Sequence, residues 1–299
     1  MLAKRFAFCF AAVGSAASVL TPRGGDTAVG NHWTDHDKVT PLPELPDDGL
    51  LGQLEKRFSP ILYAYQGCIP YAAVNSDGYA GGGLRPTGDT GGDCRDFSQT
   101  GQLYATVGKS HGRWAVLYSY YLPKVHGPAE QHRHHWLSLV VWLSITKCPA
   151  KAENAKILAT SFSTAPGEFV RRIDTIFTTA LGGNSSGPRT HPVVRYDGGQ
   201  PLLPSPFAPE ALRFDDDPEV EVEEPPRRLA GAASGQTDPL APPLVGWEKL
   251  PPLVKEQFNG IQYEHTKVPF SANNVQQYLD AAYADHIFSN SPIEYECQT

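Results

Sequence analysis

The central part of the chain alternates long apolar runs with very short polar turns, and this pattern limits the possible folds more than any other feature. Residues 102–108 (QLYATVG) and 113–122 (RWAVLYSYYL) flank the turn Lys109-Ser110-His111-Gly112. Two such runs around a short glycine-containing turn predict a β-hairpin. Residues 135–145 (HWLSLVVWLSI) are apolar enough to form a further strand in the core.

Weaker signals for strands and helices lie on both sides of this segment. Strands are predicted at residues 61–68, 156–163, 168–173 and 192–198. Helices are predicted from Asp47 or Asp48 to Phe58, at about 250–259, and at about 272–285 with Ser271 as the cap. Many short strands with turn signals between them are typical of a β-sandwich. The sequence therefore predicts a mainly β protein, a β-sandwich with flanking helices.

The N-terminus has the features of a secretory signal peptide over residues 1–17. Lys4 and Arg5 precede an apolar run, and small residues offer a cleavage site near Ala17. The run is too short to span a bilayer. Its removal deletes two of the 25 basic side chains and none of the 32 acidic ones. We therefore expect a secreted, extracellular and acidic monomer, for which nucleic acid is a poor partner.

Composition divides the rest of the chain into a domain and less regular segments. Residues 18–43 are rich in Gly, Thr, Pro and Asp, and are predicted to be a flexible lead-in. One domain is predicted at 44–290, followed by a tail at 291–299. Within it, a Pro-rich insert at about 200–243 carries seven acidic side chains between Asp215 and Glu224 and is predicted to be disordered. Asn184 begins a glycosylation sequon.

Cleavage of the signal peptide would also remove Cys9. The cysteines that remain are Cys68, Cys94, Cys148 and Cys297. An even number of cysteines in an exported chain predicts disulfides, and four cysteines allow three connectivities. No C-x-x-C pair is present to indicate a structural zinc site.

Histidines are concentrated just before the last central strand. His132, His134 and His135 lie within four residues, with His126 upstream, in a chain of ten histidines. Such a cluster indicates either a metal site or proton transfer, and the alternative is a polar strand entrance that happens to be rich in histidine. On a regular strand, His132 and His134 share a face while His135 points away, so a site using all three would need a bulge.

Several motifs in this chain resemble those of the necrosis- and ethylene-inducing peptide 1-like proteins, which are secreted by fungi, oomycetes and bacteria. The resemblance is carried by YSYYLPK (118–124), QHRHHW (131–136) and VVWL (140–143). Other segments follow in the expected order: HDKV (36–39), GCIPYAAV (67–74), GLRPTG (83–88), LVGWEKLP (244–251) and VPF (268–270). Together they cover roughly residues 36–286.

The resemblance implies a β-sandwich similar to the actinoporin pore-forming toxins. It also implies an activity, since toxic members bind sphingolipid headgroups of plant plasma membranes and lyse the cells with a bound Ca²⁺ or Mg²⁺. It further implies a disulfide between Cys68 and Cys94, which leaves Cys148 and Cys297 as a second pair.

The chain departs from this family at the positions implied to hold the cation. In toxic members these are an Asp after Pro-Lys, and the first His, the Asp and the Glu of the heptapeptide. Here the heptapeptide is Gln131, His132, Arg133, His134, His135, Trp136 and Leu137, with Val125 after Pro-Lys. Of the four implied cation-binding positions, only that of the first His is kept, as His132. Val125, His135 and Leu137 replace the three carboxylates. Hard cations need several oxygen ligands, so no Ca²⁺ or Mg²⁺ cofactor is expected.

Three functions stay open at this point. The first is a non-cytolytic secreted effector, with a plant sphingolipid or another host surface as partner. The second is a working cytolysin in which Asp93, Asp96 or Glu130 supplies oxygen ligands. The third is a transition-metal protein that uses His126, His132 and His135, with His132 and His135 the ligands of the degenerate site. The glycine runs have no nucleotide-binding spacing, and no enzymatic activity is predicted.

Overall fold

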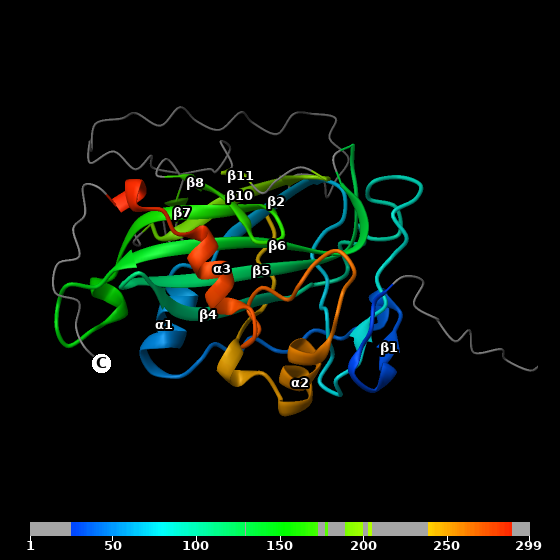
Figure 1. Ribbon diagram of the computed structural model, residues 1–299, viewed down its shortest axis with the longest axis horizontal. Coiled ribbons are helices and arrows are strands. Elements are labelled where there is room, and N and C mark those ends of the chain that lie inside the picture. Colours follow the sequence, from blue (N-terminus) through cyan, green and yellow to red (C-terminus); the bar gives the residue numbers. More distant parts are fainter. Residues whose placement is uncertain are drawn as a thin grey trace, which may run out of the picture.

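The central apolar runs form one large sheet in the computed structural model, which describes residues 25–128, 130–172, 177–178, 189–199, 203–204 and 239–288 (Figure 1). Its strands, in spatial order, are β12 (Leu244–Gly246), β4 (Leu103–Ser110), β5 (Arg113–His126), β6 (Gln131–Ser144), β7 (Lys156–Ala165) and β8 (Glu168–Arg172). Neighbouring strands are antiparallel except for β12 and β4, which are parallel.

The predicted hairpin is confirmed, with a tighter turn than the sequence indicated. Ser110 still pairs with Arg113, so the connection has only two residues. His111 and Gly112 both adopt positive φ values, 50° and 79°, which is the backbone of a two-residue turn that follows the twist of the strands.

A smaller sheet forms the second layer of the sandwich. It contains β11 (Leu203–Pro204), β10 (His191–Asp197) and β2 (Ile61–Gln66), and β9 (Phe177–Thr178) also pairs with β10. Away from both sheets, β1 (Trp33–Thr34) pairs with β3 (Ala80–Gly81). Alternation along β2 places Leu62 in the main core, whereas Ile61 and Tyr63 pack in a second cluster with Val193.

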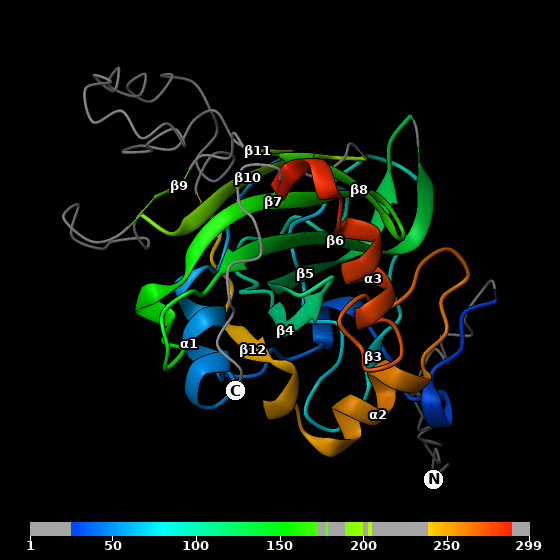
Figure 2. The same ribbon diagram turned by 60° about the vertical axis from the view of Figure 1, so that its left-hand side comes forward.

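Different elements cover the two faces of the large sheet. The Tyr118 hydroxyl donates to the carbonyl of Glu55 in α1 (Gly49–Arg57), and the Tyr120 hydroxyl donates to the carbonyl of Pro60, just before β2. On the other face, α3 (Val275–Ala282) packs across the strands, as Figures 1 and 2 show. The predicted β-sandwich with flanking helices is therefore confirmed.

The three helices agree with prediction in position and differ at their ends. The first is confirmed, with Asp48 as N-cap, and α2 spans Pro252–Gly260. The last is shorter than predicted, because Asn274 rather than Ser271 is its N-cap and the chain leaves helical geometry at Tyr283. No helix in the described part is long and apolar enough to cross a membrane.

The predicted flexible lead-in is wrong for its described part, residues 25–43. Val39 and Leu42 are buried, and the Leu42 N–H donates to the side chain of Gln102 at 2.7 Å. Thr27 exchanges backbone hydrogen bonds with Gln262. A few apolar side chains and these pairings order a segment whose average composition is polar.

Several predicted segments fall outside the described residues. They include the signal peptide, residues 18–24, Asn184, most of the acidic insert and the tail. The described ends of the insert belong to the fold: Leu203 pairs with Arg195 of β10, and Leu240 pairs with Leu62 of β2.

Candidate metal centre at the β5–β6 turn

The histidine motif lies inside β6, because both central strands extend further than predicted. The ladder between β5 and β6 continues to the pairs Val125–His132 and His126–Gln131. Beyond it, the Gly127 N–H donates to the carbonyl of Glu130 at 2.9 Å. This end of the hairpin therefore holds the motif against the strand that carries Val125.

His134 is a buried structural histidine with an unusual backbone. It has a φ of 55°, in the left-handed region that non-glycine residues seldom adopt, and is 1% exposed. Burial lowers its pKa well below the ordinary value, so the ring is neutral. Its Nδ1 is hydrogen-bonded to the Tyr121 hydroxyl at 2.7 Å, while its Nε2 lies 3.6 Å from a carboxylate oxygen of Asp26.

The glycine loop packs closely against the side chains of Arg133 and His134. Gly83, at φ 60°, lies so near that an added Cβ would be 2.6 to 2.9 Å from atoms of Arg133, His134 and Pro123. Arg133 Nη1 donates to the carbonyls of Gly82 and Gly83 at 2.6 and 3.2 Å. The loop from 76 to 93 thus fixes the middle of the motif.

The left-handed backbone conformation of His134 brings His132 and His135 together, whereas the alternation of a regular strand predicts that they point to opposite faces. Their ring centroids are 5.4 Å apart. The Glu130 carboxylate lies between them, with one oxygen 2.6 Å from His132 Nε2 and the other 3.8 Å from His135 Nδ1. One potential ligand atom from each of the three residues lies within 4.8 Å of the others.

Hydrogen bonds fix how His132 presents its ring. Its Nδ1 lies 3.0 Å from the carbonyl oxygens of both Arg133 and His134, so this nitrogen carries a hydrogen and Nε2 faces Glu130. Burial acts to lower the pKa of His132, but the hydrogen bonds and the charge of Glu130 outweigh it and raise that pKa. For Glu130, burial acts to raise the pKa, and the neighbouring histidines reverse this and lower it.

His135 has the opposite electrostatic character. The residue is 7% exposed, and burial lowers its pKa to about 4. Its Nδ1 makes no hydrogen bond with any described residue, although it points toward Glu130. His265 lies at the open side, with its ring centroid 5.3 Å from that of His132 and its side chain half exposed.

The other residues of the motif are structural. Val125 and Leu137 are 0% and 1% exposed in the core, and Trp136 packs edge-on against Tyr104 and Phe270. Gln131 is exposed and donates to the carbonyl of Gly127. These positions supply no carboxylate, so the residues present do not fit the Ca²⁺ or Mg²⁺ site that the resemblance implied.

The other candidate ligands lie outside this cluster. Within the described residues, Glu130, His132 and His135 are the one group of three potential ligands that meet, and His126 is not among them. Asp93 and Asp96 line a separate pocket of about 450 Å³ with Asp37. The sequence indicates Glu130 only as an oxygen donor for a hard cation, and it gives no signal for His265, which is far away along the chain.

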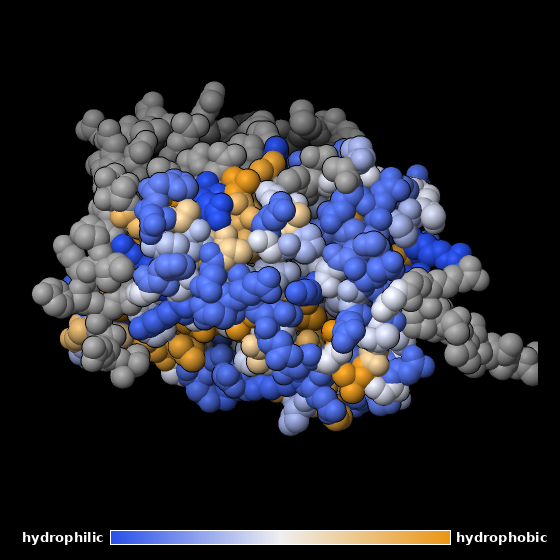
Figure 3. Space-filling model, viewed as in Figure 1, coloured by the Kyte–Doolittle hydropathy of each residue, from blue (hydrophilic) through white to orange (hydrophobic). Residues whose placement is uncertain are grey.

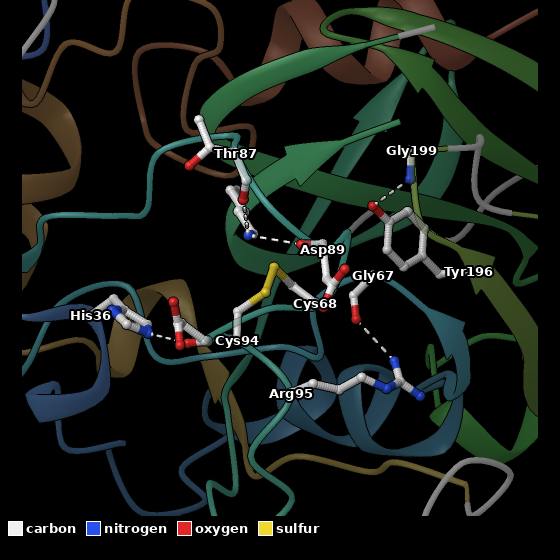
Figure 4. Close-up of a disulfide and its surroundings, with 11 residues drawn as sticks. His36, Gly67, Cys68, Thr87, Asp89, Cys94, Arg95, Tyr196 and Gly199 are labelled. Carbon is white, nitrogen blue, oxygen red and sulfur yellow. Dashed lines mark hydrogen bonds between the residues drawn. A yellow bond between two sulfur atoms is a disulfide. The ribbon is translucent and has the colours of Figure 1, made fainter. Parts of the chain in front are cut away.

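The predicted disulfide between Cys68 and Cys94 is present beside that pocket (Figure 4). Arg95 next to it donates to the carbonyls of Gly67 and Ala64, and His36 lies 2.7 Å from the carbonyl of Asp93. Cys148 is also disulfide-bonded, and its predicted partner, Cys297, lies outside the described residues.

Residues 52–282 match the family model for Necrosis inducing protein (NPP1), which is most of the chain. The chain belongs to this family. NLP effector protein 2 of Phytophthora capsici is 27% identical over 83% of this chain and 86% of its own length. NLP effector protein 10 of the same organism is 38% identical over 44% of this chain and 55% of its own. For NLP effector protein 10 and two similar relatives, the matched part of this chain spans about half of the relative's own length.

Solved structures of NPP1-type proteins share the fold. NLPPya in complex with glucosamine superposes with a TM-score of 0.58 at 25% identity, over 84% of this chain and 99% of that one. NLPPya in complex with mannosamine gives 0.59 at 24% identity over the same shares. The non-toxic HaNLP3 protein gives 0.60 at 22% identity, over 83% and 98%.

Proposed function

We propose that this chain is a secreted effector of the NPP1 family that does not lyse plant plasma membranes. The observation that carries the proposal is the state of the three positions where the resemblance implies cation-binding carboxylates. Val125 and Leu137 are apolar and buried in the core, and His135 is a buried imidazole that burial keeps neutral.

The chemistry of the remaining donors supports this proposal. Ca²⁺ takes six to eight oxygen ligands, and Mg²⁺ requires near-octahedral oxygen coordination. Among the described residues, Glu130 is the carboxylate that meets His132, and it is engaged at 2.6 Å by that imidazole. Because neutral imidazole suits softer ions, a hard cation gains little from this site.

We further propose that the partner is a plant plasma-membrane sphingolipid headgroup or another sugar-bearing host surface. Relatives of the same fold have been solved in complex with mannosamine and with glucosamine. The face of this protein in Figure 3 is largely hydrophilic, with apolar side chains in separate small groups. Such a face suits polar headgroups better than insertion into the hydrocarbon of a bilayer.

A leakage assay tests the proposal. Residues 18–299 are added to dye-loaded vesicles of plant plasma membrane with Ca²⁺, Mg²⁺ or chelator, next to a toxic relative as positive control. No release above buffer is expected at doses where the relative empties the vesicles. Release that chelator abolishes would overturn the proposal. Sedimentation of the protein with the same vesicles tests surface binding separately from lysis.

A further inference from the structure

We propose that Glu130, His132 and His135 bind a divalent transition-metal ion, with Zn²⁺ the best match, and that His265 completes the site. This goes beyond the proposed function, and its test does not depend on lysis or its absence. The geometry that points to it is the meeting of three potential ligand atoms within 4.8 Å where β6 begins, two of them from buried histidines.

The first step is the orientation of His132. Its Nδ1 hydrogen is held by two backbone carbonyls at 3.0 Å, which directs Nε2 into the cluster. A metal-binding histidine characteristically donates its other ring N–H to a carbonyl or carboxylate, which fixes the tautomer and the ring orientation. His132 already has this arrangement.

The second step is the unsatisfied nitrogen of His135. The ring is more than nine-tenths buried, and its Nδ1 finds no hydrogen-bond partner among the described residues while it points into the cluster. A buried polar atom without a partner destabilises a fold, and such atoms need an explanation. An ion between His135, His132 and Glu130 would give this nitrogen a ligand bond.

The third step is the class of metal. Two imidazoles and one carboxylate match Zn²⁺, for which sets of two His and one Glu are known, and they are too poor in oxygen for Ca²⁺ or Mg²⁺. Cu²⁺ and Ni²⁺ also accept such ligands. A tetrahedral ion with bonds of about 2.0–2.1 Å separates its ligand atoms by roughly 3.3 Å, so the three side chains need only close slightly.

The fourth step is access. The ring of His265 lies next to that of His132, and the His265 side chain is half exposed. The Glu130 side chain is about a quarter exposed. An ion can therefore enter from this side, and His265 can swing in to supply a third nitrogen. Entry from solvent and a complete ligand set are what a functional metal site requires.

Calorimetric titration of residues 18–299 with Zn²⁺ tests the inference, with Co²⁺ absorption as a second readout of tetrahedral nitrogen and oxygen ligation. One ion per chain is expected. Glu130→Gln and His135→Gln should weaken binding at least about tenfold, and His265→Asn by less. The matched control is His111→Asn at the opposite end of β5, where the positive φ of His111 suits asparagine. It should bind as the unmodified protein does.

Three outcomes would overturn the inference. They are the absence of Zn²⁺ binding by the unmodified protein, equal affinity in Glu130→Gln and His135→Gln, and tighter binding of Ca²⁺ than of Zn²⁺. Thermal unfolding of each variant without metal identifies loss of fold. His265→Asn and Glu130→Gln change partly exposed side chains, so the test remains decisive if His135→Gln does not fold.

Discussion

The rings of His132 and His135 lie side by side, with centroids 5.4 Å apart, although three positions separate them on one strand. Residues at this spacing on a regular strand point to opposite faces. The left-handed backbone of His134 between them, with its φ of 55°, removes that alternation. The candidate metal centre therefore depends on one backbone conformation as much as on the ligands.

This dependence predicts an unusual order of stability at position 134. In a regular strand, glycine is less stable than alanine by roughly 0.5–1 kcal/mol. At a left-handed position the penalty falls on the Cβ and is about 1–2 kcal/mol. Both His134→Gly and His134→Ala remove the imidazole, so the two variants lose nearly the same packing. The Cβ penalty then decides the order, and the glycine variant should be the more stable one. Denaturant unfolding of the two variants measures the difference; a more stable alanine variant would contradict it.

A second prediction concerns the disulfide between Cys68 and Cys94. The two cysteines are 26 residues apart, so the bond restricts a loop of that length in the unfolded chain. Replacing both by alanine should lower the free energy of unfolding by about 3 kcal/mol. The hydrogen bonds of Arg95 to the carbonyls of Gly67 and Ala64 remain, which favours an unchanged native loop. A loss below about 1 kcal/mol in urea unfolding would show that the loop is already ordered in the unfolded chain.

The long strands could be predicted because their apolar runs and turns are local signals. Val140, Val141 and Trp142 are in the core, as their run indicated. β12 was missed because it has only three residues and pairs with β4, far away in sequence. The ordered part of the lead-in was missed for a similar reason, since pairings such as Thr27 with Gln262 leave no local signal.

The candidate site could be predicted in part. The sequence singled out His132 and His135 as ligands, and the structure brings them together. The choice of His126 as their companion was wrong, because strand periodicity does not show that Glu130 folds back at the hairpin end. Nor does periodicity reveal the positive φ of His134.

A third prediction concerns pH and Glu55, which is 0% exposed. Its carboxylate accepts the Asp47 N–H at 2.8 Å, yet burial raises its pKa to about 8 from an ordinary value of 4.5. Between these values the unfolded chain loses the proton and the folded protein keeps it. The contribution to stability is therefore complete below about pH 4.5 and is lost as the pH rises through about 8.

Glu55→Gln tests this pH dependence because the amide keeps an acceptor for Asp47 and does not titrate. The unmodified protein should lose stability, relative to this variant, by an amount on the order of a few kcal/mol between the two values. Urea unfolding at several pH values measures the difference, which cancels the effects of titrating groups that do not interact with Glu55; Asp47, whose carboxyl group interacts with that of Glu55, is part of the effect measured. Parallel profiles for the two proteins would mean that Glu55 is ionised in the fold.

The last prediction concerns Arg171 of β8, which holds the end of α3. Its guanidinium donates to the carbonyls of Ala281, Ala282 and Tyr283 at 2.5, 3.3 and 3.3 Å. The final carbonyls of a helix have no partners within it, and a cation there also interacts favourably with the helix dipole. Ser161 donates a further hydrogen bond to Ala282, at 2.9 Å. This is how the C-terminal helix is attached to the outer face of the large sheet.

Arg171→Met should therefore lower the free energy of unfolding by about 2–3 kcal/mol, because it removes charged donors from half-buried carbonyls. Arg171→Lys keeps the charge without the planar group that reaches several carbonyls, so an intermediate loss is expected. Hydrogen exchange of the α3 amides should rise more than exchange in β5, since the damage is local. If the methionine variant were as stable as the unmodified protein, packing of Tyr278 and Leu279 alone would hold the helix in place.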